Sequence, residues 1–240
     1  MSVLVLLRHG QSHWNLANRF TGWMDVDLTA KGEAEAKRAG ELLAETKVEF
    51  DAAYTSMQTR AIRTLWLACT QMELCWLPVT KDYRLNERHY GDLTGRNKAE
   101  TAEIHGKEQV QIWRRSYDIP PPEMSWDNPQ NPCRDRRYAG VNRAELPSAE
   151  SLKMTLQRVL PYYTDEIEPH LAAGKNLLIS AHGNSLRSLI KHLFAVPDEK
   201  IVHVEIPTGN PLLIELDHQQ KPISARYLDT DRANPLPDVP

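Results

Sequence analysis

The 240-residue chain has an ordinary composition for a globular protein, with 41% hydrophobic and 25% charged residues. Its length allows one α/β domain or two small ones. The net charge of −3 gives no overall basic field that would favour nucleic acid, although a local arginine cluster can still attract an anion. The three cysteines, Cys69, Cys75 and Cys133, form no CxxC pair, which argues against a disulfide framework or a structural zinc site.

The chain begins with an apolar segment that predicts a buried strand. Residues 3–7 (VLVLL) are continuously apolar and include β-branched valines, as in strands that are covered on both faces. The segment is too short to span a membrane, and it lacks the basic region that begins a signal peptide. We therefore expect no membrane partner and a cytoplasmic protein.

The next part of the chain alternates helix and strand patterns. Residues 11–28 are polar and predict a loop, and Thr29 is the expected N-cap of a helix over residues 30–45. A second strand is predicted over residues 51–55, with Ser56 as the N-cap of the helix that follows. The apolar face of that helix is expected to hold Met57, Ala61, Leu65, Ala68 and Met72.

A long segment without periodicity, residues 116–147, separates the two halves of the chain. Its prolines include Pro120, Pro121, Pro122, Pro129 and Pro132. Irregular segments of this length are often lids or binding loops, and we predict such a loop here. A linker between two domains is the alternative.

The C-terminal half continues the alternation. Helices are predicted around Leu152, Leu156, Val159 and Tyr163, and around Leu186, Leu189, Ile190 and Leu193. Strands are predicted over residues 177–181, 202–206, 212–216 and 224–228. The whole pattern predicts a three-layer α/β/α sandwich with a mostly parallel central sheet, in one domain over residues 1–230. The short proline-rich tail, residues 231–240, is expected to be mobile.

Two of the predicted buried strands end in a histidine that is followed by glycine. In open α/β sheets, ligands bind beyond the carboxyl ends of the strands, so His9 and His182 could meet in one crevice. Gly10 and Gly183 would let the backbone turn sharply beside a ligand. Arg60 falls in the first turn of a predicted helix, where backbone N–H groups attract anions. These features together predict an anion-binding site.

The other histidines lack such surroundings. We interpret them as ordinary core or surface residues, namely His13, His105, His170, His192, His203 and His218. His89 adjoins a candidate acid and is kept as a supporting residue.

Many motifs, in one order, resemble the histidine phosphatase superfamily. Residues 7–12 (LRHGQS) with Trp14 and Asn15 resemble its signature. Further motifs resemble the phosphoglycerate mutase branch, which uses 2,3-bisphosphoglycerate. They are residues 20–23 (FTGW), 54–56 (YTS), 86–91 (NERHYG), 95–98 (GRNK), 113–117 (WRRSY), 120–122 (PPP), 181–187 (AHGNSLR) and 207–209 (PTG). The resemblance runs from about residue 3 to about residue 228. It implies a phosphoglycerate mutase-like fold and the interconversion of 3-phosphoglycerate and 2-phosphoglycerate.

The chemistry of the residues agrees with this resemblance. A neutral imidazole on His9 can attack phosphorus, and a phosphohistidine splits one transfer into two easier steps. The phosphoryl group in flight needs donors that stabilise its negative oxygens. The candidates are Arg8, Arg60 and His182, with Asn15 and Asn184 as neutral donors.

The resemblance also assigns roles to residues whose local sequence is ambiguous. Glu87 matches the acid–base residue, which would exchange protons with the substrate hydroxyls, although it could be a solvated glutamate beside Arg88. Arg114 and Arg115 match residues that hold the carboxylate and the phosphate that stays in place, although a basic pair often ends a solvated helix. The resemblance further places Tyr90, Lys98, Ser12, Thr21, Gly22 and Gly183 in the substrate site.

Cofactor and partners follow from the same resemblance. 2,3-Bisphosphoglycerate is expected to phosphorylate His9, and no metal is expected because arginines neutralise the phosphates. Ser12 and Gly22 match the mutase branch rather than bisphosphoglycerate synthases. Many relatives have a longer, lysine-rich tail that is thought to cover the site, so closure of this site is an open question. A homodimer or a homotetramer is open as well. The alternatives for function are a phosphatase of the same superfamily and a non-catalytic protein on the same fold.

Overall fold

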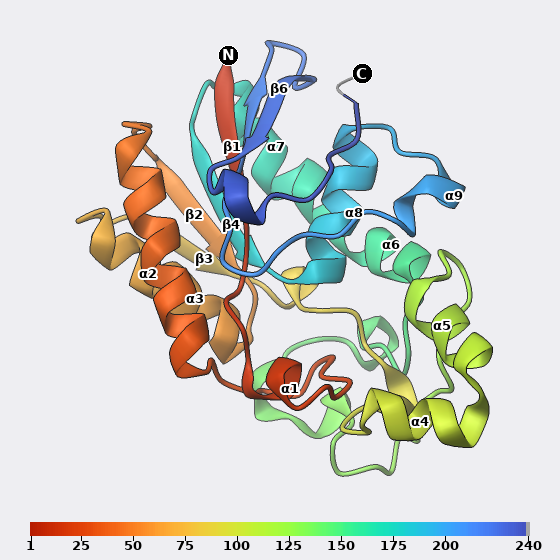
Figure 1. Ribbon diagram of the computed structural model, residues 1–240. Helices are drawn as coiled ribbons and strands as arrows, with labels where there is room; N and C mark the ends of the chain where they lie inside the picture. Colours follow the sequence, from red (N-terminus) through yellow and green to blue (C-terminus); the bar gives the residue numbers. More distant parts are fainter. Residues whose placement is uncertain (239–240) are drawn as a thin grey trace.

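The computed structural model describes residues 1–238, which are built around one six-stranded sheet (Figure 1). The strands are β1 (Ser2–Arg8), β2 (Ala52–Thr55), β3 (Val79–Lys81), β4 (Leu177–Ala181), β5 (Leu212–Leu216) and β6 (Pro222–Tyr227). Their order across the sheet is β3-β2-β4-β1-β5-β6. The first four strands in that order are parallel, and β5 is antiparallel to both β1 and β6. The predicted α/β class and mostly parallel sheet are confirmed.

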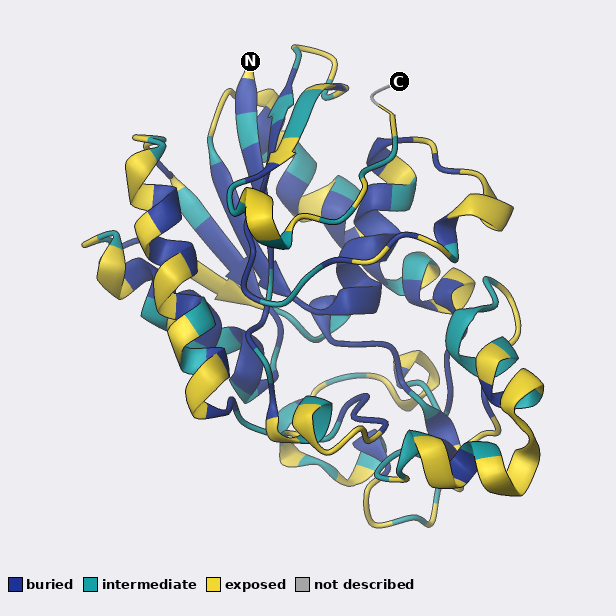
Figure 2. Ribbon diagram, viewed as in Figure 1, coloured by how far each residue is buried: buried dark blue, intermediate teal, exposed yellow. Residues whose placement is uncertain are grey.

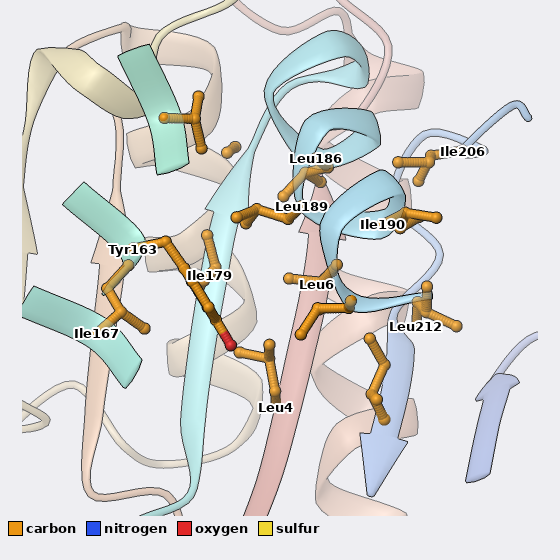
Figure 3. Close-up of a cluster of buried hydrophobic side chains, with 14 of the residues drawn as sticks. Leu4, Leu6, Tyr163, Ile167, Ile179, Leu186, Leu189, Ile190, Ile206 and Leu212 are labelled. Carbon is orange, nitrogen blue, oxygen red and sulfur yellow. The ribbon is translucent and has the colours of Figure 1, made fainter. Parts of the chain in front are cut away.

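Helices cover both faces of the sheet, as a three-layer sandwich requires. One face carries α2 (Ala30–Glu45) and α3 (Thr59–Gln71), and the other carries α6 (Leu152–Tyr162), a π-helical turn (Tyr163–Ile167), α7 (Glu168–Ala172) and α8 (Gly183–Leu193) (Figure 1). Alternate residues of β1 point to opposite faces of the sheet and pack against the two helix layers. Leu4 and Leu6 pack in the core beneath α6 and α8 (Figure 3), while Val5 and Leu7 pack beneath α2 and α3.

The segments beyond the carboxyl ends of the parallel strands form the lower part of the molecule in Figure 1. They contain α1 (His13–Leu16), α4 (Lys98–His105) and α5 (Lys107–Arg115). They also contain the irregular segment over residues 116–147, whose 3₁₀ turns are Pro132–Arg134, Arg136–Tyr138 and Arg143–Glu145. Tyr138 and Leu146 of this segment pack with Trp23. Figure 2 shows that the outer surfaces of α4 and α5 are largely exposed.

Several local predictions are corrected. No strand covers residues 202–206, because α9 (Asp198–Ile201) is followed by an irregular segment that only alternates buried and exposed residues. The 11–28 loop contains the short helix α1. Ser56 does not cap α3, which begins at Thr59 after Gln58; instead, Ser56 Oγ accepts a hydrogen bond from the Gln58 backbone N–H at 3.2 Å. Met57 therefore precedes the helix that it was expected to join.

The start of the predicted tail lies against the domain. Arg232 donates to the carbonyl oxygens of Thr208 and Gly209, and Asn234 Nδ2 donates to the carbonyl of Glu205 at 3.1 Å. Leu236 packs against the core. Residues 239–240 lie outside the described residues, so the mobility of the tail stays a prediction, as does the 1–230 domain boundary. Within residues 1–238, we find no helix with the length and apolar character of a membrane span.

Candidate active site

A cavity of about 290 Å³ opens at the carboxyl ends of β1 and β4. It is lined by Arg8, His9, Asn15, Arg19, Thr21, Gly22, Arg60, Glu87, Tyr90, Lys98, Arg114, Arg115, Gly183, Asn184, Arg187 and residues 204–206. Seven of these residues are arginine or lysine, and two are glutamate. A protein with a net charge of −3 therefore concentrates positive charge in one concave site, which suits a ligand with several negative charges.

His9 presents an unprotonated nitrogen to this cavity. Its Nδ1 lies 2.7 Å from the carbonyl oxygen of Gly10, so Nδ1 carries the proton, and Nε2 accepts a hydrogen bond from Arg60 Nε at 3.3 Å. Burial, with the positive charges of Arg60 and Arg8 added, holds the pKa of His9 well below its usual 6.5. The imidazole is therefore neutral at cellular pH, with a lone pair on Nε2.

His182 lies beside His9, as the two strand ends predicted. The ring centroids are 5.0 Å apart in an edge-to-face arrangement. His182 Nε2 is 2.7 Å from Ser56 Oγ, and its buried Nδ1 has no hydrogen-bond partner in the described part of the chain. Burial and the charge of Arg60 lower its pKa well below 6.5. His182 is thus a neutral ring behind the cavity lining, with one nitrogen left for a further partner.

Arg60 is fixed by the backbone around it. It is 1% exposed in the first turn of α3, and its two terminal nitrogens donate to the carbonyl oxygens of Met24 and Gly22, both at 2.8 Å. Burial lowers its pKa to about 10, against the opposing pull of Glu87, so the guanidinium keeps its charge at neutral pH. The N–H on Nε donates to His9 Nε2.

Arg8 brings a second positive charge to the surroundings of His9. Its Nη1 donates to the Ile206 carbonyl at 2.6 Å, while its buried Nε has no partner within residues 1–238. A Cβ on Gly183 would lie 3.4 Å from the Arg8 guanidinium carbon, at van der Waals distance, so the start of α8 lies directly beside Arg8.

Glu87 is held so that one carboxylate oxygen remains available. Oε1 accepts from the backbone N–H groups of Arg88 at 2.8 Å and Asn184 at 3.1 Å. No hydrogen bond to Oε2 is found within the described residues, and Oε2 would lie 3.7 Å from a Cβ on Gly183. The side chain is 8% exposed and lines the cavity. The alternative of a solvated glutamate is therefore wrong.

The far wall of the cavity carries the other basic residues. Lys98 and Arg114 line it, and burial lowers the pKa of Lys98 below its usual 10.5. Arg115 lines it as well, but its guanidinium is paired with Glu205, whose pKa this ion pair lowers. The Tyr90 hydroxyl accepts a hydrogen bond from Asn184 Nδ2 at 3.3 Å. Arg114 and Arg115 end helix α5, as the alternative interpretation expected, but both also line the cavity.

The loop around α1 supplies the near rim. Thr21 and Gly22 line the cavity through a buried turn in which Gly22 has φ +53°, a conformation that favours glycine. Asn15 Oδ1 accepts from the Ser12 backbone N–H at 3.1 Å, which leaves the Asn15 NH₂ group for a ligand. Ser12 caps α1 from behind and does not line the cavity. Of the predicted site residues, only Ser12 and His182 stand outside the lining.

Sequence reasoning missed three charged residues of the lining. Arg187 is 5% exposed on α8; it donates to Asn184 Oδ1 at 3.0 Å and to the Ile201 carbonyl at 2.6 Å. Glu205 lies in the segment that was predicted as a strand, and Arg19 lies at the rim. Arg187 belongs to the AHGNSLR motif and could have been found by its position one turn after His182. Glu205 had no local signal.

No set of three or more His, Cys, Asp or Glu side chains within residues 1–238 is arranged to hold a metal ion. The cysteines are free thiols, with Cys69 buried and Cys75 exposed. Positive charge at the site comes from arginine and lysine.

The model of the histidine phosphatase superfamily (branch 1) matches residues 4–228. The chain belongs to this superfamily. The resemblance seen in the motifs is confirmed. Curated relatives narrow it further: the chain is 62% identical to a 2,3-bisphosphoglycerate-dependent phosphoglycerate mutase of Hyphomonas neptunium and 64% identical to one of Caulobacter sp., each over 100% of both chains. A relative of the same name from Maricaulis maris is 55% identical over 100% of this chain and 99% of its own.

Solved structures of the superfamily share the fold. A mycobacterial glucosyl-3-phosphoglycerate phosphatase aligns with a TM-score of 0.70 at 21% identity, over 95% of this chain and 97% of its own. An α-ribazole-5′-P phosphatase from Escherichia coli aligns with a TM-score of 0.70 at 23% identity, over 97% and 98%. At this identity the likeness establishes the fold.

The buried histidines of this superfamily member predict a pH-dependent stability. Burial lowers the pKa of His89 to about 4 and holds those of His9 and His182 well below 6.5. Below pH 6.5 the unfolded chain binds protons that the folded chain does not, so the free energy of unfolding falls as the pH decreases. Each histidine contributes up to about 1.4 kcal/mol per pH unit between 6.5 and its folded pKa.

We expect urea unfolding between pH 7 and pH 5 to show this loss, with a smaller slope in His89→Gln. His203, which is exposed, provides the control: His203→Gln should keep the wild-type slope. A wild-type stability that stays constant across this window contradicts the interpretation.

Proposed function

We propose that this protein interconverts 3-phosphoglycerate and 2-phosphoglycerate through a phosphohistidine on His9, which 2,3-bisphosphoglycerate forms initially. The observation that carries the proposal is one cavity that combines two sets of residues. It holds the His9 nucleophile with the charges of Arg8 and Arg60. It also holds Lys98 and Arg114, which suit an anionic group that is not transferred. The full-length relatives at 62–64% identity bear the name of this activity.

The His9 end supports phosphoryl transfer in both directions. His9 Nε2 forms a bond to phosphorus, while the bond from phosphorus to the donor oxygen breaks. Arg8, Arg60 and the free nitrogen of His182 stabilise the phosphoryl oxygens as charge shifts among them. In the other half-reaction, the free hydroxyl of a phosphoglycerate forms a bond to phosphorus while the bond from phosphorus to His9 Nε2 breaks.

Glu87 supplies and removes the proton. The donor oxygen leaves as an alkoxide that takes a proton from Glu87, and the attacking hydroxyl later returns a proton to the same carboxylate. Its backbone-bound Oε1 fixes the group, and Oε2 is the oxygen left for exchange.

The far wall selects the substrate. Arginine forks match carboxylate and phosphate oxygens, and a glycerate phosphate carries both groups. Arg115 also lines this wall, where it is paired with Glu205. A bound carboxylate or phosphate would take the place of the Glu205 carboxylate as the partner of Arg115. Asn15, Thr21, Gly22, Tyr90, Gly183 and Asn184 complete the contact surface, with Ser12 behind Asn15.

A coupled assay tests the proposal. Conversion of 3-phosphoglycerate should require catalytic 2,3-bisphosphoglycerate in the purified, unphosphorylated protein and should proceed with little phosphate release. Release of phosphate without formation of 2-phosphoglycerate would instead assign the protein to the phosphatases of its superfamily. Assay of both products in one sample separates the two outcomes.

Independence from metal is the next prediction. Arg8, Arg60, Lys98 and Arg114 supply the positive charge of the cavity, so we expect the conversion rate to survive a strong chelator. The measurement compares the rate before and after exhaustive dialysis against chelator. Loss of activity that returns with magnesium or manganese would contradict the mechanism. We place the reaction in the cytoplasm, where such metabolites occur.

Arg114 should control the ratio of mutase to phosphatase activity. Arg114→Ala removes a charge-assisted contact, typically about 1.5–3 kcal/mol or tenfold to a hundredfold in rate or affinity. The glycerate is then poorly oriented toward phosphorylated His9, while attack by water needs no such grip. We expect lower conversion and a higher fraction of phosphate release. Arg38→Ala, on the exposed face of α2, is the control and should change neither rate.

A further inference from the structure

A buried ion pair outside the cavity holds the segment that carries Glu87. Arg158 of α6 donates to Glu150 from Nε to Oε1 at 2.7 Å and from Nη2 to Oε2 at 2.8 Å. The side chains are only 8% and 3% exposed. Neither residue lines the cavity. The pair therefore cannot contact a substrate there, and its effect must pass through the residues that it binds.

The other N–H groups of Arg158 converge on the backbone just before and at Glu87. Nη1 donates to the carbonyl oxygens of Arg84 at 2.8 Å, Asn86 at 3.2 Å and Tyr83 at 3.3 Å. Nη2 donates to the carbonyl of Glu87 itself at 3.2 Å. One guanidinium thus holds a 3₁₀ turn and the residue that follows it, a geometry that the planar fork of arginine allows and a lysine ammonium does not.

Glu150 holds the same segment from its other end. Its Oε2 accepts from the His89 backbone N–H at 2.9 Å, and its own backbone N–H donates to the His89 carbonyl at 2.9 Å. Residues 83–89 are therefore bound on both sides of Glu87. The backbone of Glu87 is fixed as well. Its N–H donates to Gln58 Oε1, and its carbonyl accepts from Trp23 Nε1, so only the carboxylate faces the cavity.

Stability alone does not explain this arrangement. Moving two charges out of water is costly, so the attraction between the two charges adds little net stability. What the ion pair adds is direction, because a bidentate fork with four carbonyl acceptors fixes the backbone within a narrow range. Proton transfer needs a fixed backbone at Glu87, since a proton donor must lie within hydrogen-bond reach of the reacting oxygen.

We propose that Arg158 and Glu150 are positioning residues for proton transfer by Glu87, acting through the backbone of residues 83–89. This inference rests on the acid–base role proposed above for Glu87. It assigns a catalytic consequence to an ion pair that touches neither substrate nor His9.

Two phosphoryl donors with different leaving groups can separate a loss of proton transfer by Glu87 from a general disturbance of the site. When 2,3-bisphosphoglycerate phosphorylates His9, an alkoxide leaves and must take a proton from Glu87. When 2,4-dinitrophenyl phosphate does so, the same N–P bond forms, but the phenolate is a stable anion and leaves without a proton. A variant that misplaces Glu87 slows the first reaction and spares the second, whereas a variant that disturbs the whole site slows both.

The experiment measures single-turnover phosphorylation of His9 from both donors. For Arg158→Lys and Glu150→Gln we expect the rate from 2,3-bisphosphoglycerate to fall about tenfold to a hundredfold, as small misplacements of catalytic groups do. The rate from 2,4-dinitrophenyl phosphate and the affinity for 2,3-bisphosphoglycerate should stay at wild-type values. Glu87→Gln should give the same pattern. Arg38→Lys is the matched control, because Arg38 pairs with Glu41 on the exposed face of α2, outside residues 83–89, and it should change neither rate.

A double variant guards against misfolding. Arg158→Met with Glu150→Leu replaces the ion pair by apolar side chains of similar size, which leaves no unpaired buried charge while it removes the fork. A folded double variant should reproduce the selective loss. Equal loss with both donors, or no loss in any folded variant, overturns the inference. Failure of the proposed function is a separate result, in which the wild type accepts no phosphate from 2,3-bisphosphoglycerate but does accept it from the aryl donor.

Discussion

His9→Ala should neither accept a phosphoryl group nor convert 3-phosphoglycerate. Removal of the imidazole eliminates the covalent route, so the conversion rate should fall by at least about 10⁴-fold, as for other lost nucleophiles. Wild-type protein incubated with labelled 2,3-bisphosphoglycerate should carry an acid-labile phosphate that maps to His9, and the variant should carry none. The fold should persist, because His9 faces the cavity and contributes no side chain to either main hydrophobic cluster.

His203→Ala serves as the control for this prediction, since His203 is an exposed histidine that does not line the cavity. It should label and turn over as the wild type does. Mass spectrometry of the labelled protein then decides the assignment. A phosphate on any other residue, or on His9→Ala itself, would show that His9 is not the nucleophile.

The central fold could be predicted because its strands are buried on both faces. Residues 3–7 are continuously apolar, residues 177–181 are apolar except for Ser180, and a His-Gly pair closely follows each segment; both form neighbouring parallel strands, β1 and β4. β3 was missed because Val79, Thr80 and Lys81 are all exposed at the sheet edge, so no burial pattern marks them. The reverse error, a strand over residues 202–206, arose because alternating burial also occurs in an irregular segment that packs on a core.

The site could be predicted to the extent that its residues sit in recognisable motifs. Local sequence pointed to His9, His182 and Arg60, and the resemblance added Glu87 and the basic far wall. Neither local sequence nor the resemblance could predict ion pairs between residues that are distant in sequence. Arg115 and Glu205 are ninety positions apart, and their contact depends on how α5 and the segment after α9 approach one another. Such contacts are set by tertiary packing rather than by any local pattern.

Arg60 offers a sharper test of the electrostatics of the site, because its charge and its shape can be separated. Arg60→Met removes the charged donor beside His9 Nε2, the atom proposed to receive the phosphoryl group; loss of such a donor typically costs about 10²- to 10³-fold in kcat. Arg60→Lys keeps the charge but loses the fork that binds the carbonyl oxygens of Gly22 and Met24. Both variants should be slower than the wild type, with circular dichroism confirming that each is folded.

The pH dependence should distinguish these two variants. His9 attacks only as neutral imidazole, and after burial the charge of Arg60 is the largest cause that lowers its pKa. Without that charge the pKa of His9 rises, so the acid limb of the kcat/KM profile of Arg60→Met should move to higher pH. In Arg60→Lys the charge remains, and the limb should stay near its wild-type position. Rates of His9 phosphorylation between pH 5 and pH 8 measure both limbs. If the limb of Arg60→Met coincides with that of the wild type, burial and the charge of Arg8 keep His9 neutral without Arg60, and Arg60 acts only on the phosphoryl group.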